Sequence, residues 1–571
     1  MSRIHFDKRR DFLKGAACMA ASGAAATFVP QLSMMGTALA QSAPTGYKAL
    51  VCIYLSGGND SWNLLIPSDT STQIPIAGRT ALAPYGPTPY GWYVTSRGGL
   101  FQGSGSQLGI PLVGGGAAGQ LPNALALQGV PYALNPAAAN NAGLGTETGL
   151  RRMFNQGRLA FIANVGPLVE PVRRQNFNTW KRPPQLYSHN DQTNLWQIGG
   201  GDNSSQPSGW GGRMAGRLLG TSPASGLSPC ISISGQTRFL VGEYSGGQPV
   251  IPYRLSTSGT NPATSLNNYA GGNLAGTKRR EVLESLLNTT YPQAFSNEYG
   301  QIVDRSMNLS TGINQAIGLL GTDTRFTQAQ GGNAISFNAA VNNIPGSGLG
   351  NQLRQVARMI AVSRPGVSGF SIAANRQVFY VSTGGYDTHD AQIPAAAPVN
   401  GTWGGHQGLL QQVAQAVHFF YEAIAVLNNV PGYSGVLNEV MGFTQSEFAR
   451  TINSNGSGTD HAWGAVQMVF GRPASEGGPL NGGQIYGRYP LQLLNRSFSG
   501  SPDLLGESFN RGEFLPTTSV DQMSATFARW MGVSAVDVPV LFPNIGAFTN
   551  GSHPNAAVMA YNTQTVPFIT V

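Results

Sequence analysis

Two strand-like runs that end in similar polar sequences limit what this chain can fold into. Residues 47–55 (YKALVCIYL) lead into SGGND, which ends at Asp60, and residues 376–382 lead into TGGYD, which ends at Asp387. A continuous apolar run of this length is typical of a strand buried on both faces, as in parallel sheets. Ligands of open α/β sheets lie beyond the carboxyl ends of strands. The pattern therefore predicts both aspartates at a ligand-bearing edge, although Asp60 alone would suit a turn or a helix N-cap.

The stretch 436–471 predicts a second part of the same edge. Residues 436–443 are mostly apolar and predict a strand, followed by a Gly/Ser/Asn-rich loop at 453–459 and an apolar run at 465–470. Polar side chains stand where the first strand should end and where the last should begin. These are Gln445, Ser446, Glu447 and Arg450, then Asp460 and His461. A carboxylate and an Asp-His pair at such positions predict a site.

The rest of the chain predicts helices around such a sheet. Helices are expected at 209–219, 278–287, about 298–320, 351–362 and 406–427, a helix followed by a strand within 149–165, and a strand-like segment at 230–241. With 76 glycines, 36 prolines and only 11% charged residues, the chain should be rich in loops, above all at 68–148. Its length after residue 40 suits one large α/β domain or two smaller ones.

The N-terminus predicts export. Arg9-Arg10 precedes a modestly apolar stretch at 15–29, and Ala38-Leu39-Ala40 has the small-x-small cleavage pattern of a signal peptide. The alternative is a short membrane anchor, but the stretch is broken by Pro30 and falls short of the roughly 20 apolar residues of a span. We expect a twin-arginine signal at residues 1–40, transport by the twin-arginine translocase, cleavage after Ala40, and a periplasmic or secreted product without a transmembrane segment.

Charge and cysteine content exclude some classes of function. The signal holds five basic and two acidic residues, so +5 of the total charge of +8 remains after cleavage, and no basic run follows. Nucleic-acid binding is therefore not indicated. Of the three cysteines, Cys18 leaves with the signal. A Cys52–Cys230 disulfide is possible in an oxidising compartment, but Cys52 lies in an apolar strand and we expect it buried and unpaired.

Four of the seven histidines stand beside carboxylates at predicted element ends. They are His189, His389, His406 and His461, and the carboxylates are Asp60, Asp387, Glu447 and Asp460. A lone histidine is usually structural, as we expect for His418 in the middle of a helix. Imidazole and carboxylate together are ligands for zinc, manganese or iron, and two such ions about 4 Å apart would clamp an in-line displacement.

The motifs LSGGNDSWNLLIP, YSHNDQTNLWQ, GWGGRMAGRL, STGGYDTHDAQ, TQSEFART and GTDHAWG occur in this order between about residues 47 and 547. In this the chain resembles the domain-of-unknown-function 1501 family of exported bacterial proteins. That family is in turn similar to the alkaline phosphatase and sulfatase superfamily. The resemblance implies one domain at 41–571 with insertions at about 68–148 and 220–345. It also implies a three-layer α/β sandwich with a mostly parallel central sheet and metals at strand ends.

The resemblance also implies roles for single residues. Asp60 matches a metal ligand after the first strand, and Asp387 matches a ligand after a later strand. His406, or else His389, matches the histidine partner of Asp387, and His461 matches the last metal-binding histidine. Ser188, at a helix start, matches the nucleophile.

Two departures from the superfamily stand in the same motifs. Glu447 stands where the superfamily has the aspartate of an Asp-His pair, and Phe448 replaces the histidine of that pair. One metal site would then lack a nitrogen ligand. Ser188 is followed by His189, which is not the phosphatase pattern.

Two functions follow as hypotheses. The first is a hydrolase of phosphate, sulfate or other esters that depends on one or two divalent ions, zinc or manganese, held by the aspartates and histidines together with Glu447 and Asp460. Ser188 would attack with His189 beside it, unless Ser188 is only an N-cap paired with Asp191. Arg450, Arg173 or Arg174 would bind an anionic group. The second is a non-catalytic exported binding or surface protein that keeps the fold, for example in carbohydrate or polymer uptake.

Overall fold

The computed structural model describes residues 46–67, 86–101, 132–134, 149–200, 206–220, 226–244, 247–257, 274–287, 294–370, 372–392, 404–490 and 511–570, with single residues between some of these ranges. The predicted signal at residues 1–40 lies outside the described residues, as does most of 68–148. No helix of the described ranges is both long and apolar enough to cross a membrane.

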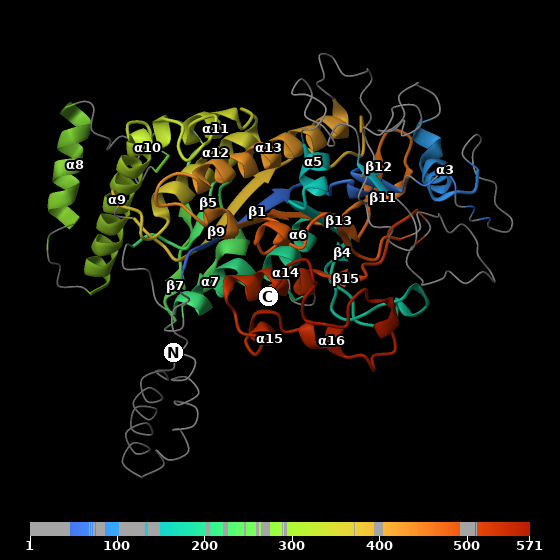
Figure 1. Cartoon of the computed structure of the whole chain (residues 1–571). Helices are drawn as coiled ribbons and strands as arrows, with labels where there is room; N and C mark the ends of the chain where they lie inside the picture. Colours follow the sequence, from blue (N-terminus) through green and yellow to red (C-terminus); the bar gives the residue numbers. More distant parts are fainter. Residues whose placement is uncertain are drawn as a thin grey trace, which may run out of the picture.

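A nine-stranded mixed sheet forms the centre of the molecule (Figure 1). Neighbouring strands pair in parallel except at β13, which is antiparallel to both β10 and β4. The prediction of a mostly parallel central sheet is therefore confirmed. The strands lie in the order β14 (Ile485–Gly487), β4 (Leu159–Gly166), β13 (Ala465–Gly471), β10 (Val440–Gln445), β1 (Lys48–Leu55), β9 (Arg376–Thr383), β5 (Cys230–Ser232) and β8 (Tyr253–Arg254), and β15 (Thr518–Ser519) also pairs with β4.

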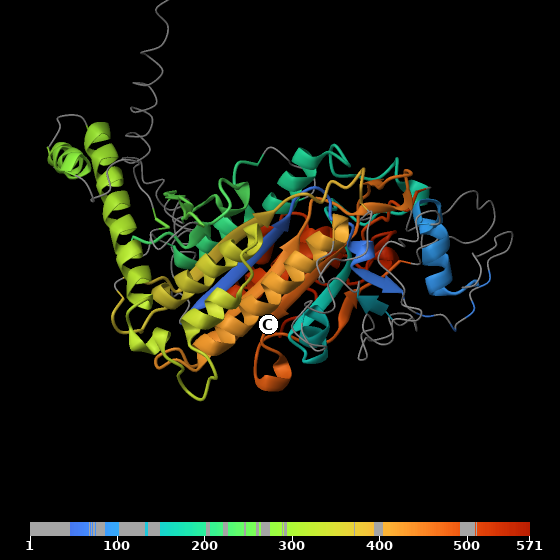
Figure 2. The same cartoon turned by 90° about the horizontal axis from the view of Figure 1, so that it is seen from above.

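Helices cover both faces of this sheet. Alternate residues of β1 enter two separate apolar cores, with Val51 and Ile53 in one and Leu50 and Cys52 in the other, because successive side chains of a strand point to opposite faces. The first core contains α11 (Phe337–Asn343), α12 (Gly348–Ser363) and α13 (Gly405–Asn428). The second contains α6 (His189–Ile198), α7 (Trp210–Leu219) and α14 (Val520–Met531). Figure 2 shows α12 and α13 lying along one face of the sheet.

Other elements lie at the ends of this sandwich. The helices α8 (Leu274–Leu287) and α9 (Ala294–Leu320) stand at one end, and α3 (Pro89–Phe101) stands at the opposite end (Figures 1 and 2). Next to α3, β11 (Arg450–Ser454) and β12 (Thr459–His461) form a two-stranded antiparallel hairpin. The shorter described elements include α5 (Leu150–Asn155), α10 (Thr324–Thr327), α15 (Val538–Leu541), α16 (Ile545–Thr549), β2 (Leu65–Pro67), β3 (Tyr132–Leu134), β6 (Gly242–Glu243) and β7 (Pro249–Val250).

Some sequence predictions need correction. The strand expected at 436–443 begins only at Val440, because Val436–Asn438 form a 3-10 turn. The loop predicted at 453–459 is the turn of the β11–β12 hairpin, which was not predicted. Of the strand-like segment 230–241, only β5 is a strand, and Arg238–Leu240 form a 3-10 helix.

The prediction that Cys52 is buried and unpaired is confirmed, since Cys52 and Cys230 are both buried free thiols. The two residues lie on β1 and β5, which are separated by β9. Strands two positions apart in a sheet are about 9–10 Å apart. That separation exceeds the distance of about 7 Å between Cα atoms that a disulfide can bridge.

Candidate metal centre

Strand direction brings the polar residues of the predicted site to one edge of the sheet. The neighbours β10, β1 and β9 are parallel, so the segments that follow them, with Glu447, Asp60 and Asp387, start at the same edge. Because β13 runs the other way, the residues that precede it, including His461, lie at this edge too. The prediction that Asp60 and Asp387 share one end of the sheet is confirmed.

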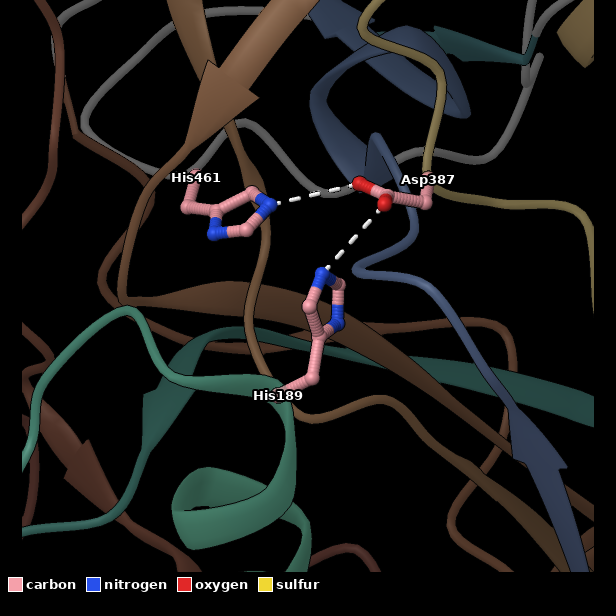
Figure 3. Close-up of side chains that lie close together, drawn as sticks. All are labelled: His189, Asp387 and His461. Carbon is pink, nitrogen blue, oxygen red and sulfur yellow. Dashed lines mark hydrogen bonds and ion pairs between the residues drawn. The ribbon is translucent and has the colours of Figure 1, made fainter.

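Two neighbouring histidines each face one oxygen of the Asp387 carboxylate (Figure 3). His461 Nε2 lies 3.2 Å from Asp387 Oδ1, and His189 Nε2 lies 3.4 Å from Asp387 Oδ2. Ligand atoms of these three residues all lie within 4.8 Å of one another. The three come from the start of α6, the loop after β9 and the end of β12, so the fold rather than local sequence brings them together.

The second ring nitrogen of each histidine is held by an acceptor. His189 Nδ1 lies 2.8 Å from Glu447 Oε1, and His461 Nδ1 lies 2.8 Å from the carbonyl oxygen of Tyr187. A carbonyl can only accept, so the proton of a neutral His461 ring is on Nδ1 and its Nε2 carries a lone pair. The carboxylate of Glu447 favours the same tautomer in His189. A histidine whose outer nitrogen is fixed in this way is typical of metal ligands.

A third histidine joins this group. His389 Nε2 lies 2.8 Å from His461 Nε2 and 3.3 Å from Asp387 Oδ1. Its Nδ1 lies 3.0 Å from Asp460 Oδ1, and Asp460 is itself ion-paired with Arg511. Three Nε2 atoms therefore lie near one carboxylate, and a proton or a cation must separate their lone pairs from its oxygens and from each other.

Glu447 is a buried carboxylate whose two oxygens both accept hydrogen bonds. Besides His189, the amide of Gly57 donates to Oε1 at 2.7 Å, and the hydroxyls of Tyr54 and Ser446 donate to Oε2 at 3.1 and 3.3 Å. The side chain is only 1% exposed. Glu447 therefore lies behind His189 and orients the imidazole, whereas the sequence suggested that it binds metal directly.

Arg450 fixes the central carboxylate. Its buried guanidinium donates from Nη1 to Asp387 Oδ1 at 2.7 Å and to the carbonyl of Gly57 at 3.2 Å. Burial raises the pKa of Asp387, but the hydrogen bond and charge of Arg450, together with the hydrogen bond of His461, outweigh it and hold the pKa below its ordinary value. Arg450 is 0% exposed, so it positions Asp387 and does not present its charge to solvent.

The two histidines that face Asp387 titrate differently. The hydrogen bond to Glu447 raises the pKa of the half-buried His189 above its ordinary value, despite burial that opposes the shift. Burial lowers the pKa of His461, and the positive charge of Arg450 lowers it further. His461 is therefore the neutral ring, which is the form that binds a metal.

The ring of Phe448 packs against the imidazole rings of both His189 and His461. Its ring centroid is 4.9 Å from that of His189 and 4.5 Å from that of His461. It also packs on Gly58, where a Cβ atom would lie 2.3 Å from the Phe448 ring. Phe448 thus supports the two histidines and contributes no ligand atom.

The turn before α6 is strained. Tyr187 has a φ of 72°, in the left-handed region that bulky side chains rarely adopt. Gln192 holds this turn through hydrogen bonds from Nε2 to the carbonyls of Pro184 and Gln185, at 3.0 and 3.2 Å. The conformation aims the Tyr187 carbonyl at His461. Strain of this kind is concentrated at functional sites, and the sequence analysis gave no role to Tyr187.

Ser188 has the geometry of a helix N-cap. Its hydroxyl donates to Asp191 Oδ2 at 2.7 Å and accepts from the Asp191 amide at 3.5 Å. The cap fixes the start of α6 between Tyr187 and His189, both of which contact the cluster. Arg173 and Arg174, expected to bind an anion, lie half-buried at a 3-10 helix (Arg174–Asn176).

Asp60 and His406 lie outside this cluster. Both are fully buried, and Asp60 is ion-paired with Arg97. His406 Nδ1 lies 3.0 Å from Asn63 Nδ2 and its Nε2 lies 2.9 Å from Asn59 Oδ1. Amide groups therefore satisfy both ring nitrogens, and burial lowers the pKa of His406 to about 4. Of the two candidate partners of Asp387, the structure places His389 beside it. His418 is buried in the middle of α13.

Comparison with known proteins gives one finding. Residues 369–493 match the family model described as "Protein of unknown function (DUF1501)". This supports the resemblance drawn from the motifs, and the matched segment contains Asp387, His389, Glu447, Asp460 and His461. No curated protein and no solved structure matches the chain.

Proposed function

We propose that this chain is an exported, metal-dependent hydrolase of phosphate, sulfate or other ester bonds with an alkaline-phosphatase-like fold. One observation carries the proposal. The Nε2 atoms of His189, His389 and His461 all point at the carboxylate of Asp387, while an acceptor engages each Nδ1 atom. Proteins orient histidines in this way to bind a cation.

The charges around the cluster also suit a cation. Three carboxylates, Asp387, Glu447 and Asp460, are close to two guanidinium groups, Arg450 and Arg511. With neutral imidazoles this leaves one net negative charge, which a divalent ion would reverse. Imidazole and carboxylate ligands suit zinc, and manganese is the alternative.

The proposed roles follow from position and exposure. Asp387, His189 and His461 would hold the ion, with His389 as a further ligand oriented by Asp460. A bound divalent cation would supply Lewis acidity, polarising the ester and activating a nucleophile. Asp387 is 48% exposed, so an ester can approach the centre from solvent. Ser188 remains the proposed nucleophile, and the Asp191 carboxylate is placed to receive its proton.

The alternative is a non-catalytic exported binding or surface protein. The Ser188 hydroxyl is already engaged in capping α6, which favours this alternative. So does the burial of Arg450, because that guanidinium cannot reach a substrate anion. In this reading the cluster would bind a cation or a ligand without turning over an ester.

The proposal includes export by the twin-arginine translocase to the periplasm or outside the cell. Replacing Arg9 and Arg10 with lysine should abolish export, and the intact mass of the exported chain should correspond to cleavage after Ala40. An exported chain that keeps residues 1–40 would contradict this part of the proposal.

Hydrolysis of 4-nitrophenyl phosphate, sulfate and acetate by the purified exported chain tests the activity. We expect at least one ester to be hydrolysed, with the rate lost on chelation and restored by Zn²⁺ or Mn²⁺. His461→Ala should be inactive, and His553→Ala, a histidine outside the cluster, should be as active as wild type. Ser188→Gly, which removes the hydroxyl at little cost to the helix cap, should lose activity without losing metal. A wild-type protein that binds metal but hydrolyses none of the three would support the binding-protein alternative.

A further inference from the structure

A second, fully buried charge pair lies beside the candidate metal centre. Asp60, which follows β1, is 0% exposed, and Arg97 of α3 is 1% exposed. Arg97 Nη2 donates to Asp60 Oδ1 at 2.8 Å, and Gln392 Nε2 donates to Asp60 Oδ2 at 2.6 Å. Both carboxylate oxygens of Asp60 are therefore already engaged by donors from the chain itself.

The surroundings hold Arg97 in place and keep it charged. Its Nη1 donates to the carbonyl of Thr451 at 3.4 Å, and the guanidinium lies over the ring of Tyr93 with a centroid distance of 5.5 Å. Burial lowers the pKa of Arg97, but the charge of Asp60 outweighs it and the pKa lies above its ordinary value. The pair is thus neutral as a whole, and His406 beside it is an uncharged residue held by amides.

We infer that Arg97 is a built-in cation that takes the place of a metal ion at Asp60, so that the centre holds one ion, beside Asp387. The inference deepens the proposed function, on which it rests. A buried carboxylate needs a positive partner. Asp60 finds that partner in the chain, whereas the cluster around Asp387 keeps an excess negative charge and partly exposed histidine side chains.

The same contacts connect α3 to the metal centre. Gln392 accepts a hydrogen bond from the Thr459 hydroxyl at 2.6 Å, and Arg450, which holds Asp387, donates from Nε to that hydroxyl at 3.4 Å. A continuous chain of hydrogen bonds therefore runs from Arg97 through Asp60 to Asp387. Helix α3 belongs to the segment 68–148, so this loop-rich segment contributes to the site.

The test combines metal stoichiometry with melting of two variants. Wild type should bind one equivalent of Zn²⁺ or Mn²⁺ per chain, and two equivalents would overturn the inference. Arg97→Met leaves Asp60 buried without a counter-charge, so its melting midpoint should fall by about 5 °C or more. Millimolar Mn²⁺ should raise that midpoint again.

The double variant Asp60→Asn/Arg97→Met is the matched control. It should melt above Arg97→Met alone, and Mn²⁺ should raise its midpoint by no more than it raises that of wild type, through the centre beside Asp387. If the single and double variants melt together, or Mn²⁺ raises both equally, then Asp60 needs no cation and the inference fails. If wild type binds no metal at all, the proposed function fails, while the two melts still decide the role of Arg97.

Discussion

Replacing Glu447 should weaken metal binding although Glu447 is not a ligand in this structure. Its Oε1 atom orients His189 and also accepts from the Gly57 amide. In Glu447→Gln the amide oxygen can keep both of these contacts, and the new NH₂ group faces the Tyr54 and Ser446 hydroxyls, which can accept from it. What is lost is the negative charge behind the imidazole. Changes behind metal-binding histidines cost about 10–100-fold in affinity, so we expect a loss of about tenfold.

Glu447→Ala removes the acceptor altogether. The amide of Gly57 and the His189 ring would lose their acceptor, whereas the Ser446 hydroxyl keeps the carbonyl of Leu55 and the Tyr54 hydroxyl keeps Thr193 Oγ1. Each unsatisfied buried donor costs about 1–3 kcal/mol, although these costs are not fully additive. We expect the free energy of unfolding to fall by about 3–5 kcal/mol, as when one partner of a buried ion pair is removed, and the affinity to fall by about 100-fold.

Competition with a fluorescent zinc chelator measures the affinity, and urea unfolding of the metal-free protein measures the stability. Glu439→Gln is the matched control. Glu439 lies just before the opposite end of β10, where it is ion-paired with Arg364, so its replacement should leave the affinity unchanged. The role of Glu447 in orienting His189 would be refuted if Glu447→Gln and Glu447→Ala bound zinc as tightly as wild type. It would also be refuted if Glu439→Gln lost as much zinc affinity as they do.

Three further predictions follow from other buried groups. Gly57→Ala should destabilise the fold by about 2 kcal/mol or more and weaken metal binding. Gly57 has a φ of 121°, and a Cβ atom there would lie 2.3 Å from the Asp387 amide nitrogen. Urea unfolding and zinc-affinity measurements check this. Burial lowers the pKa of His406 to about 4, so the unfolded chain takes up the proton first as pH falls. His406 should therefore remove about 3 kcal/mol of stability between about pH 6.5 and 4, and urea titrations of His406→Asn should lack that part of the pH dependence. Cys52 and Cys230 are buried thiols, so a thiol reagent should label neither in the folded protein and both in denaturant; a mass loss of 2 Da that reduction reverses would contradict this.

The parts of the fold that follow from local sequence were predictable. The apolar run at 47–55 gives β1, and the strand ends at Asp60 and Asp387 fall at one edge as the parallel arrangement requires. The amphipathic run 351–362 lies within α12. The antiparallel direction of β13 and the β11–β12 hairpin were not predictable in this way, because strand pairing depends on contacts between segments far apart in the sequence.

The residue types of the site were predictable, but their partners were not. Asp387, His389 and His461 were expected to act on metal and do lie together, whereas Asp60 is neutralised by Arg97 from a segment with no recognisable motif. His189 was predicted both as one of four candidate ligand histidines and as the neighbour of Ser188, and it faces Asp387. Tyr187 acts through its carbonyl, which no side-chain pattern reveals. A strained backbone and a buried ion pair become visible only in three dimensions.

The central claim is that His189, Asp387 and His461 form a centre that binds a divalent cation. The most direct measurement is the thermal melt of the purified exported chain with and without a chelator, combined with metal analysis, on wild type and Asp387→Ala. Binding to the folded state alone stabilises it, so we predict about one equivalent of zinc or manganese in wild type and a midpoint that chelator lowers. The variant should carry little metal, and chelator should hardly change its midpoint. Two results together would contradict the claim. Wild type would hold less than about a tenth of an equivalent of any transition metal, even after zinc or manganese is added, and chelator would leave its melting midpoint unchanged.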